Sequence, residues 1–280
     1  IVTSATPGDQ ADGSRARRRR PFAALNEPVR DWKGRRVWIV GASSGIGAAL
    51  ARRLGRLGAR LALSARRETP LRALLAGAPT PGLALPLDVV DAGAVAAAAA
   101  RIDREWGGVD LVIWLAGRYV PMRAQDFDLG QARTMLEANL AGVLNGIDAV
   151  LPMLRRQSHG GIALVASVAG YRGLPKSLVY GPTKAALINL AEALYLDLAP
   201  EGLGVWLVSP GFVDTPMTAA NDFRMPALVD PEQAAQAIID GFGRGAFEIR
   251  FPRRFTSWMQ LLRVLPYRAH FAAVRRFTGL

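Results

Sequence analysis

The chain of 280 residues is half apolar and has no cysteine and only two histidines. It can therefore bury the core of one large domain, but it cannot form disulfides, thiolate catalysts or a histidine-rich metal centre, and we expect no metal. Its formal net charge of +12 lies in the two ends, because residues 1–36 carry +5 and residues 249–280 carry +7. The residues between them are neutral overall, and this neutrality argues against nucleic acid as a partner.

The first 34 residues are poor in apolar side chains and contain the arginine run 17–20. We expect a flexible, solvated basic arm here. A secretory signal would need an apolar stretch of about 7–15 residues after the charges. Only residues 21–25 intervene before polar residues resume, so we expect a cytoplasmic protein that meets a membrane only at its surface, if at all.

From Arg36 onward, short apolar runs alternate with stretches of helical periodicity. The runs predict strands at residues 37–40, 60–63, 83–87, 111–115, 162–165 and 205–208. Helices are predicted at residues 45–57, after Pro70, after Asp91, at 131–154, at 180–198 and from Asp230 onward. This alternation is typical of a parallel sheet with helices on both faces, and it predicts a single doubly wound, three-layer α/β/α domain over residues 35–250.

A glycine-rich turn joins the first predicted strand to the first predicted helix. A pyrophosphate binds backbone N–H groups at a helix N-terminus, and side chains would block its approach. The turn therefore predicts a Rossmann-type, dinucleotide-binding domain, with cofactor contacts from Gly41, Ser43, Ser44, Gly45, Ile46 and Gly47. The alternative is a tight strand-to-helix turn without a ligand.

The second predicted strand ends in Ala65, followed by Arg66 and Arg67. In dinucleotide folds an acid at this position binds the ribose hydroxyls, whereas a guanidinium suits a 2′-phosphate. The sequence therefore predicts NADP rather than NAD, with contacts from Arg66 and Arg67. The alternative is that both arginines are simply solvated at the start of the next helix.

Tyr180 and Lys184 stand four residues apart at the start of a predicted helix. Residues at this spacing lie on one face, so the phenol and the ammonium can meet the same ligand. A tyrosine is a poor base at neutral pH because its ordinary pKa is near 10, and a neighbouring ammonium lowers that pKa. The pair therefore predicts proton exchange with an alcohol.

With Ser167, Asn139 and the three glycines of the turn, these residues make the chain resemble the short-chain dehydrogenase/reductase family from about residue 35 to residue 245. The resemblance implies that Tyr180 is the general acid/base and that Lys184 binds the nicotinamide ribose and lowers the pKa of the tyrosine. It also implies that Ser167 hydrogen-bonds the substrate carbonyl and that Asn139 holds a water in a proton relay.

The resemblance implies further cofactor contacts near the adenine, along the nicotinamide and at its carboxamide. The implied residues are Asp88, Val89, Ala116, Gly117, Asn139, Tyr180, Lys184, Pro210, Gly211, Val213 and Thr215. Two positions depart from the family pattern. Trp114 and Leu115 stand where the family usually has two asparagines, and Val40 replaces a frequent threonine.

The implied activity is the NADP(H)-dependent interconversion of a secondary alcohol and a ketone or aldehyde, in a homodimer or homotetramer. The segment 212–229 resembles a substrate loop, and its apolar side chains favour a lipophilic substrate. A catalytically idle NADP-binding sensor or scaffold is the alternative. The missing amides at positions 114 and 115 favour that alternative, and the intact Tyr180, Lys184, Ser167 and Asn139 oppose it.

Residues 251–280 depart from the compact family pattern. Apolar residues spaced by three and four alternate with arginines, and Pro266 divides the stretch, which predicts two amphipathic helices. A basic amphipathic helix with aromatic residues suits an anionic membrane surface, so a peripheral membrane contact is one interpretation. The other is that the helices pack on the domain or on another subunit, with solvated arginines.

Overall fold

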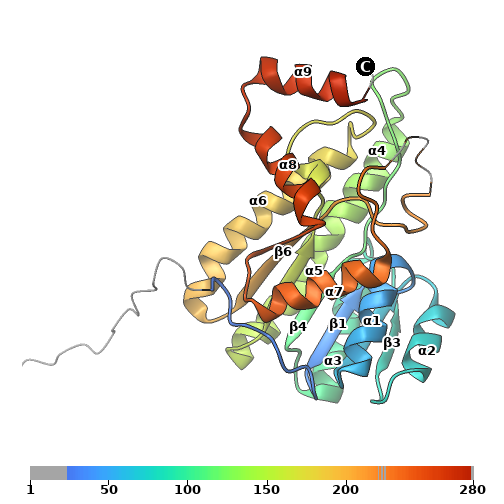
Figure 1. The fold of residues 1–280 in the computed structure, drawn as a ribbon. Helices are drawn as coiled ribbons and strands as arrows, with labels where there is room; N and C mark the ends of the chain where they lie inside the picture. The colour runs from blue at the N-terminus through green and yellow to red at the C-terminus, as the bar shows by residue number, and fades with distance from the viewer. Residues whose placement is uncertain (1–23, 220, 222, 224, 279–280) are drawn as a thin grey trace, which may run out of the picture.

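The computed structural model describes residues 24–219, 221, 223 and 225–278. Within these residues, seven parallel strands form one sheet in the order β3-β2-β1-β4-β5-β6-β7 (Figure 1). Their bounds are β1 Arg36–Val40, β2 Arg60–Ala65, β3 Leu83–Pro86, β4 Leu111–Trp114, β5 Gly161–Val165, β6 Gly204–Pro210 and β7 Glu248–Phe251. The strand order reverses between β1 and β4, and ligands of such sheets bind at that point, beyond the carboxyl ends of the strands.

Helices cover both faces of the sheet (Figure 1). The α-helices are α1 Gly45–Arg56, α2 Glu68–Ala76, α3 Ala92–Trp106, α4 Leu129–Leu136, α5 Gly142–Gln157, α6 Tyr180–Leu198, α7 Pro231–Gly243, α8 Arg253–Val264 and α9 Tyr267–Thr278. Shorter turns are the π turn Glu137–Ala141 and the 3-10 turns η2 Val168–Gly170 and η3 Ala199–Glu201. The predicted single doubly wound α/β domain is confirmed.

The sheet separates two hydrophobic cores. Trp38 and Val40 point into the core under α3, α5 and α6, while Val37 and Ile39 point into the core under α1, α2 and α7. Every second residue faces the same way because a strand has a side-chain period of two. Both faces are buried, so these strands are continuously apolar, as expected for a parallel sheet covered by helices.

Two elements differ from the sequence prediction. The helix predicted at residues 131–154 is interrupted by the π turn Glu137–Ala141, which separates α4 from α5. Strand β7 was not predicted, because its four residues alternate between buried Ile249 and Phe251 and the partly exposed Glu248 and Arg250. A four-residue run of mixed polarity carries too little periodicity to be assigned as a strand from sequence.

The expected solvated arm is corrected for residues 24–34, which pack on the domain. Trp32 is 3% exposed, and its ring lies edge-on to that of Phe242 with centroids 5.7 Å apart. The amide of Asn26 donates to the carbonyl of Val205 over 2.8 Å and accepts from its N–H over 3.0 Å. These contacts bury an aromatic ring and satisfy the hydrogen bonds of backbone groups of β6. The free energy gained in this way exceeds the cost of ordering a polar segment. The arginine run 17–20 lies outside the described residues.

The two C-terminal helices predicted around Pro266 are confirmed as α8 and α9. Helix α8 buries Thr256, Met259 and Leu262 against the domain, and α9 buries His270. The guanidinium of Arg172 donates to three carbonyls at the end of α8, those of Leu262, Arg263 and Leu265. Each helix therefore packs on the domain through one face. Among the described residues, no helix is long and apolar enough to span a membrane.

Candidate active site

The glycine-rich turn lies directly against the end of β4. Gly41 has a φ of +96°, and a Cβ there would lie 2.6 Å from the backbone nitrogen of Ala116. Only glycine allows both this conformation and this approach. Ser44 forms the N-cap of α1 without a side-chain hydrogen bond to it, and the first turn of α1 carries no acid. The N–H groups that begin α1 are therefore suited to an anion such as a pyrophosphate.

The segment after β6 lies beside the same turn. A Cβ on Gly45 would lie 2.8 Å from the Cγ2 methyl of Thr215. The N–H of Thr215 donates to the hydroxyl of Thr218, which in turn donates to the carbonyl of Val213 over 2.6 Å. The fold thus brings the predicted nicotinamide segment, including Thr215, to the predicted phosphate turn.

The predicted adenosine-side residues lie at the ends of β2 and β3. Arg66 and Arg67 are exposed, and neither forms an ion pair with another described residue. Asp88 is also exposed, and its carboxylate accepts a hydrogen bond from the N–H of Val90. Val89 is buried against Gly142 at the start of α5. Two unpaired guanidiniums at this edge can meet a phosphate without first breaking an ion pair.

Three predicted catalytic residues converge beyond β5. Lys184 is 4% exposed, and its ammonium donates to the carbonyl of Val165 over 2.9 Å while lying 5.6 Å from the centroid of the Tyr180 ring. Ser167 caps η2 by accepting from the N–H of Ala169, and its hydroxyl donates to the carbonyl of Pro210 over 3.5 Å. The hydroxyl is also close enough to the Tyr180 phenol to lower its pKa. A carbonyl oxygen placed at this hydroxyl pair could accept from both groups.

Burial dominates the titration of this cluster. It raises the pKa of Tyr180 to about 12, with the hydrogen bond to Ser167 lowering and the neighbouring Tyr119 raising it to smaller extents. Burial also lowers the pKa of Lys184 to about 8. The expectation that Lys184 lowers the pKa of the tyrosine stays a prediction, because burial is the main influence on the pKa of each group.

Asn139 is fully buried on the π turn, and its amide binds protein atoms. Its Oδ1 accepts from the N–H of Arg118 over 2.6 Å, while Nδ2 donates to the Arg118 carbonyl over 2.9 Å and to the Thr183 hydroxyl over 3.0 Å. Thr183 donates to the carbonyl of Tyr180. Asn139 thus ties the segment after β4 to the first turn of α6. Its role in holding a relay water stays a prediction.

Tyr119, which lies next to Tyr180, is not among the residues predicted from the sequence. The two rings meet edge to face with centroids 4.9 Å apart. Tyr119 follows the predicted Ala116 and Gly117 by two positions, so its place after a central strand was the available signal. It brings a second aromatic ring and a second phenol to the site.

The wall beyond Gly211 is aromatic and includes a residue from the C-terminal helices. Phe212 lies 5.8 Å from Phe223 and 5.7 Å from Phe255 of α8, measured between ring centroids. A Cβ on Gly211 would lie 2.9 Å from the ring of Phe255. Helix α8 therefore packs on the segment that follows Pro210, whose carbonyl accepts a hydrogen bond from Ser167, a contact that the sequence did not reveal.

The unusual Trp114 serves the core rather than the cofactor wall. Its ring is 3% exposed and lies edge-on to that of Trp38, with centroids 6.2 Å apart. Gly146 of α5 makes room for it, since a Cβ there would lie 2.1 Å from the indole. The ring nitrogen of Trp114 has no hydrogen-bond partner among the described residues.

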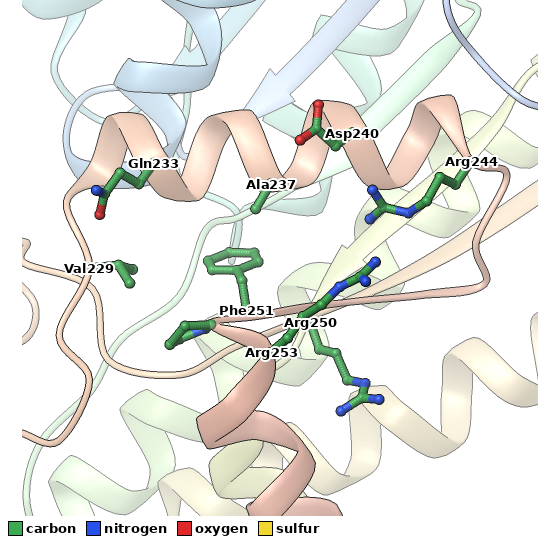
Figure 2. A pocket seen from close by; sticks show the side chains of 9 residues that line it. Val229, Gln233, Ala237, Asp240, Arg244, Arg250, Phe251 and Arg253 are labelled. Carbon is green, nitrogen blue, oxygen red and sulfur yellow. The ribbon is translucent and has the colours of Figure 1, made fainter.

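A separate pocket of about 410 Å³ opens between α7 and the end of β7 (Figure 2). It is lined by Val229, Gln233, Ala237, Asp240, Arg244, Arg250, Phe251, Pro252 and Arg253. In Figure 2, Arg244 extends from α7 above, and Arg250 and Arg253 lie below on β7 and the start of α8. None of the predicted site residues lines this pocket, so it is distinct from the place where Ser167, Tyr180 and Lys184 meet.

The family model for short chain dehydrogenases matches residues 35–224. The chain belongs to the short-chain dehydrogenase family. An uncharacterized oxidoreductase from Myxococcus xanthus is 35% identical over 245 residues, which cover 86% of this chain and 97% of the relative. An uncharacterized oxidoreductase from Staphylococcus epidermidis is 34% identical over 201 residues, which cover 72% of this chain and 87% of that relative.

Solved short-chain dehydrogenases share the fold. A short-chain dehydrogenase from Burkholderia cenocepacia, solved in complex with NADP, superposes with a TM-score of 0.76 at 26% identity and covers 88% of this chain and 99% of its own. One from Streptomyces avermitilis gives a TM-score of 0.76 at 25% identity, with coverages of 88% and 98%. This short-chain dehydrogenase is accordingly an oxidoreductase of a family that uses NAD or NADP.

Proposed function

We propose that this short-chain dehydrogenase uses NADP(H) to interconvert a secondary alcohol and a ketone or aldehyde. The observation that carries the proposal is the convergence of Tyr180, Ser167 and the buried Lys184 beside the glycine turn. A phenol and a hydroxyl that lie close to each other can both donate to one carbonyl oxygen.

Ser167 and Tyr180 act on that carbonyl in different ways. Ser167 donates a hydrogen bond to the substrate oxygen and holds it near the phenol. Tyr180 donates its proton to this oxygen as the carbonyl carbon is reduced, and the resulting phenolate lies near the ammonium of Lys184. The bound dinucleotide supplies the hydride. Oxidation of the alcohol follows the same path in reverse, with Tyr180 accepting the proton.

Tyr180 can act as the proton donor in carbonyl reduction. Burial raises its pKa to about 12, so the phenol is protonated at neutral pH. Alcohol oxidation needs the phenolate, which the nearby ammonium of Lys184 favours.

The preference for NADP rests on Arg66 and Arg67. Both guanidiniums are exposed and unpaired with any described acid at the end of β2, and the acid that would bind the ribose hydroxyls of NAD is absent. The related Burkholderia cenocepacia enzyme was solved with NADP. The aromatic wall of Phe212, Phe223 and Phe255 supports a lipophilic substrate.

The first experiment measures NADPH and NADH consumption with a panel of apolar ketones and aldehydes. Tyr180→Phe should abolish turnover and leave NADPH binding, followed by cofactor fluorescence, nearly intact. Tyr119→Phe is the matched control, because it removes the neighbouring phenol without removing the proposed acid. Binding of NADPH without reduction of any carbonyl would favour the idle sensor or scaffold. Failure to bind either dinucleotide would overturn the proposal.

A further inference from the structure

The outer sides of α8 and α9 carry large apolar side chains that nothing in the described structure covers. On α8, Trp258 is 44%, Leu261 49% and Val264 75% exposed. On α9, Tyr267 is 72%, Phe271 53% and Phe277 66% exposed. The rings of Trp258 and Phe277 touch at 5.7 Å and join the two helices into one surface. We call these six residues the C-terminal surface.

Arginines surround the C-terminal surface. The last 32 residues contain seven arginines and no acid. Six of them are exposed on α8 and α9: Arg253, Arg254, Arg263, Arg268, Arg275 and Arg276. Arg263 lies 4.0 Å from Glu192, and the other five form no ion pair with a described residue. The surface therefore combines exposed aromatic rings with six arginines, of which only Arg263 has an acidic partner among the described residues.

This combination limits what can cover the surface. Two copies of the chain meeting through it would bring arginines against arginines, because a twofold contact pairs a patch with itself. Exposed aromatics flanked by arginines are instead the composition of helices that lie in the headgroup region of a bilayer. Anionic headgroups supply the counter-charge that the protein lacks here.

We propose that the C-terminal surface docks on an anionic phospholipid bilayer, with the aromatic rings entering the headgroup region and the arginines binding lipid phosphates. The contact is peripheral. One face of each helix remains packed on the domain through Met259, Leu262 and His270 while the other meets lipid.

The docking surface lies beside the proposed substrate site. Phe255, on the inner face of α8, contacts Phe212 at the aromatic wall, and Arg172, five residues after Ser167, binds the carbonyls at the end of α8. In Figure 1, α8 and α9 lie at the end of the domain beyond α6 and β6. Docking would thus hold the aromatic wall of the substrate site close to the bilayer, where a lipophilic substrate would be dissolved. This link to the substrate rests on the proposed function.

Tryptophan fluorescence can report the contact in the full chain. Of the six tryptophans, Trp258 is 44% exposed and the other five are at most 8% exposed. Vesicles of phosphatidylcholine with phosphatidylglycerol should shift the emission of Trp258 to shorter wavelength, and lipids brominated near the headgroup should quench it. Vesicles of phosphatidylcholine alone should do neither. Co-sedimentation should weaken with salt, because screening weakens attraction to anionic lipid.

Two variants separate the apolar and charged contributions. Phe271→Ser should lower the fraction bound and the quenching of Trp258. Arg275→Gln with Arg276→Gln should weaken binding about tenfold or more, since each surface arginine contributes roughly a fivefold factor. The matched controls are Leu57→Ser, an exposed apolar residue at the end of α1, and Arg104→Gln, an arginine in the last turn of α3. Both controls should bind vesicles like the unaltered chain.

Vesicle binding is measured without dinucleotide or substrate. The docking proposal can therefore fail while the proposed carbonyl reduction is confirmed, and carbonyl reduction can fail while docking is confirmed. Co-sedimentation without quenching of Trp258 would overturn the proposal and assign the binding to another basic segment, such as residues 17–20. No binding to anionic vesicles would also overturn it. If Phe271→Ser instead changes the oligomeric state, the surface is a subunit interface and the proposal is wrong.

Discussion

Tyr119 connects the phenol of Tyr180 to the segment between β6 and α7. Its ring meets the Tyr180 ring edge to face at 4.9 Å, and its hydroxyl donates to the side-chain oxygen of Asn221 over 2.9 Å. Asn221 in turn contacts the sulfur of Met225. One side chain therefore both positions the proposed acid and anchors the segment beside the aromatic wall.

Two substitutions should distinguish the role of Tyr119 in positioning Tyr180 from its role in anchoring the segment at Asn221. Tyr119→Phe keeps the ring and removes the bond to Asn221, so the Michaelis constant for a carbonyl substrate should rise several-fold while kcat changes little. Tyr119→Leu also removes the ring contact, so kcat should fall as well, because an aromatic pair contributes about 0.5–1.5 kcal/mol to positioning. Steady-state kinetics at saturating NADPH measure both. Identical kinetics for the two variants would contradict this division.

Lys184→Met should stabilise the fold while removing activity. Burial lowers the pKa of Lys184 from 10.5 to about 8, so at pH 7 the folded protein carries a buried charge that costs about 3 kcal/mol relative to the unfolded chain. Methionine removes this cost and also the hydrogen bond to Val165, which contributes on the order of 1 kcal/mol. We expect a net gain of roughly 1–2 kcal/mol in the free energy of unfolding at pH 7.

The same variant predicts a pH dependence. Between pH 8 and 10.5 the unfolded chain binds more protons at Lys184 than the folded protein does, so the stability contributed at this residue rises with pH in the unaltered protein. The advantage of Lys184→Met should therefore shrink across this range. Denaturant unfolding at pH 7 and pH 10 tests it, and an advantage that grows with pH would show that the pKa of Lys184 is not lowered.

The fold was predictable because its signals are local. Apolar runs, helical periodicity and the glycine turn each depend on a few neighbouring residues, and they gave six of the seven described strands and the exact span of α6. Strand β7 was missed because half of its four residues are partly exposed. The packing of residues 24–34 was missed because it depends on Phe242 and Val205, more than 170 positions away.

Spacing along the chain predicted one part of the candidate site, and the family resemblance implied Ser167 and Asn139. Tyr180 and Lys184 share a helix face, so their encounter follows from the sequence. The contact of Tyr119 with Tyr180 and that of Phe255 with Phe212 join separate elements, and no local pattern encodes them. The raised pKa of Tyr180 also escaped prediction, since desolvation depends on the whole surrounding packing.

Arg66→Ala should weaken NADPH binding selectively. A hydrogen bond to a charged group contributes about 1.5–3 kcal/mol, so the Kd for NADPH should rise roughly 10- to 100-fold. The Kd for NADH should change little, because NADH lacks the 2′-phosphate. Arg104→Ala, at an exposed arginine on α3, is the control. Equal losses for both dinucleotides would mean that Arg66 contacts a part common to both, and Arg67→Ala should then be tested for the 2′-phosphate.

Gly146→Ala should destabilise the domain through Trp114. The added Cβ would lie 2.1 Å from the six-membered ring of the indole, and overpacking of this kind costs about 1–3 kcal/mol, against a gain of up to about 1 kcal/mol in helix propensity. Gly243→Ala, near the end of α7, is the matched control, because its Cβ would meet only atoms at 3.8 Å or more. Denaturant unfolding should show a loss for the first variant and none for the second.

A double-mutant cycle with Trp114→Phe decides whether the indole is the cause. Phenylalanine lacks the second ring of tryptophan, so it leaves room for a methyl group at position 146, although alone it creates a cavity that costs on the order of 1–3 kcal/mol. If the indole and the glycine are fitted to each other, the double variant should be at least about 1 kcal/mol more stable than the two single losses predict. Strict additivity would mean that Gly146 is required by the backbone of α5 and that Trp114 merely fills the space it leaves.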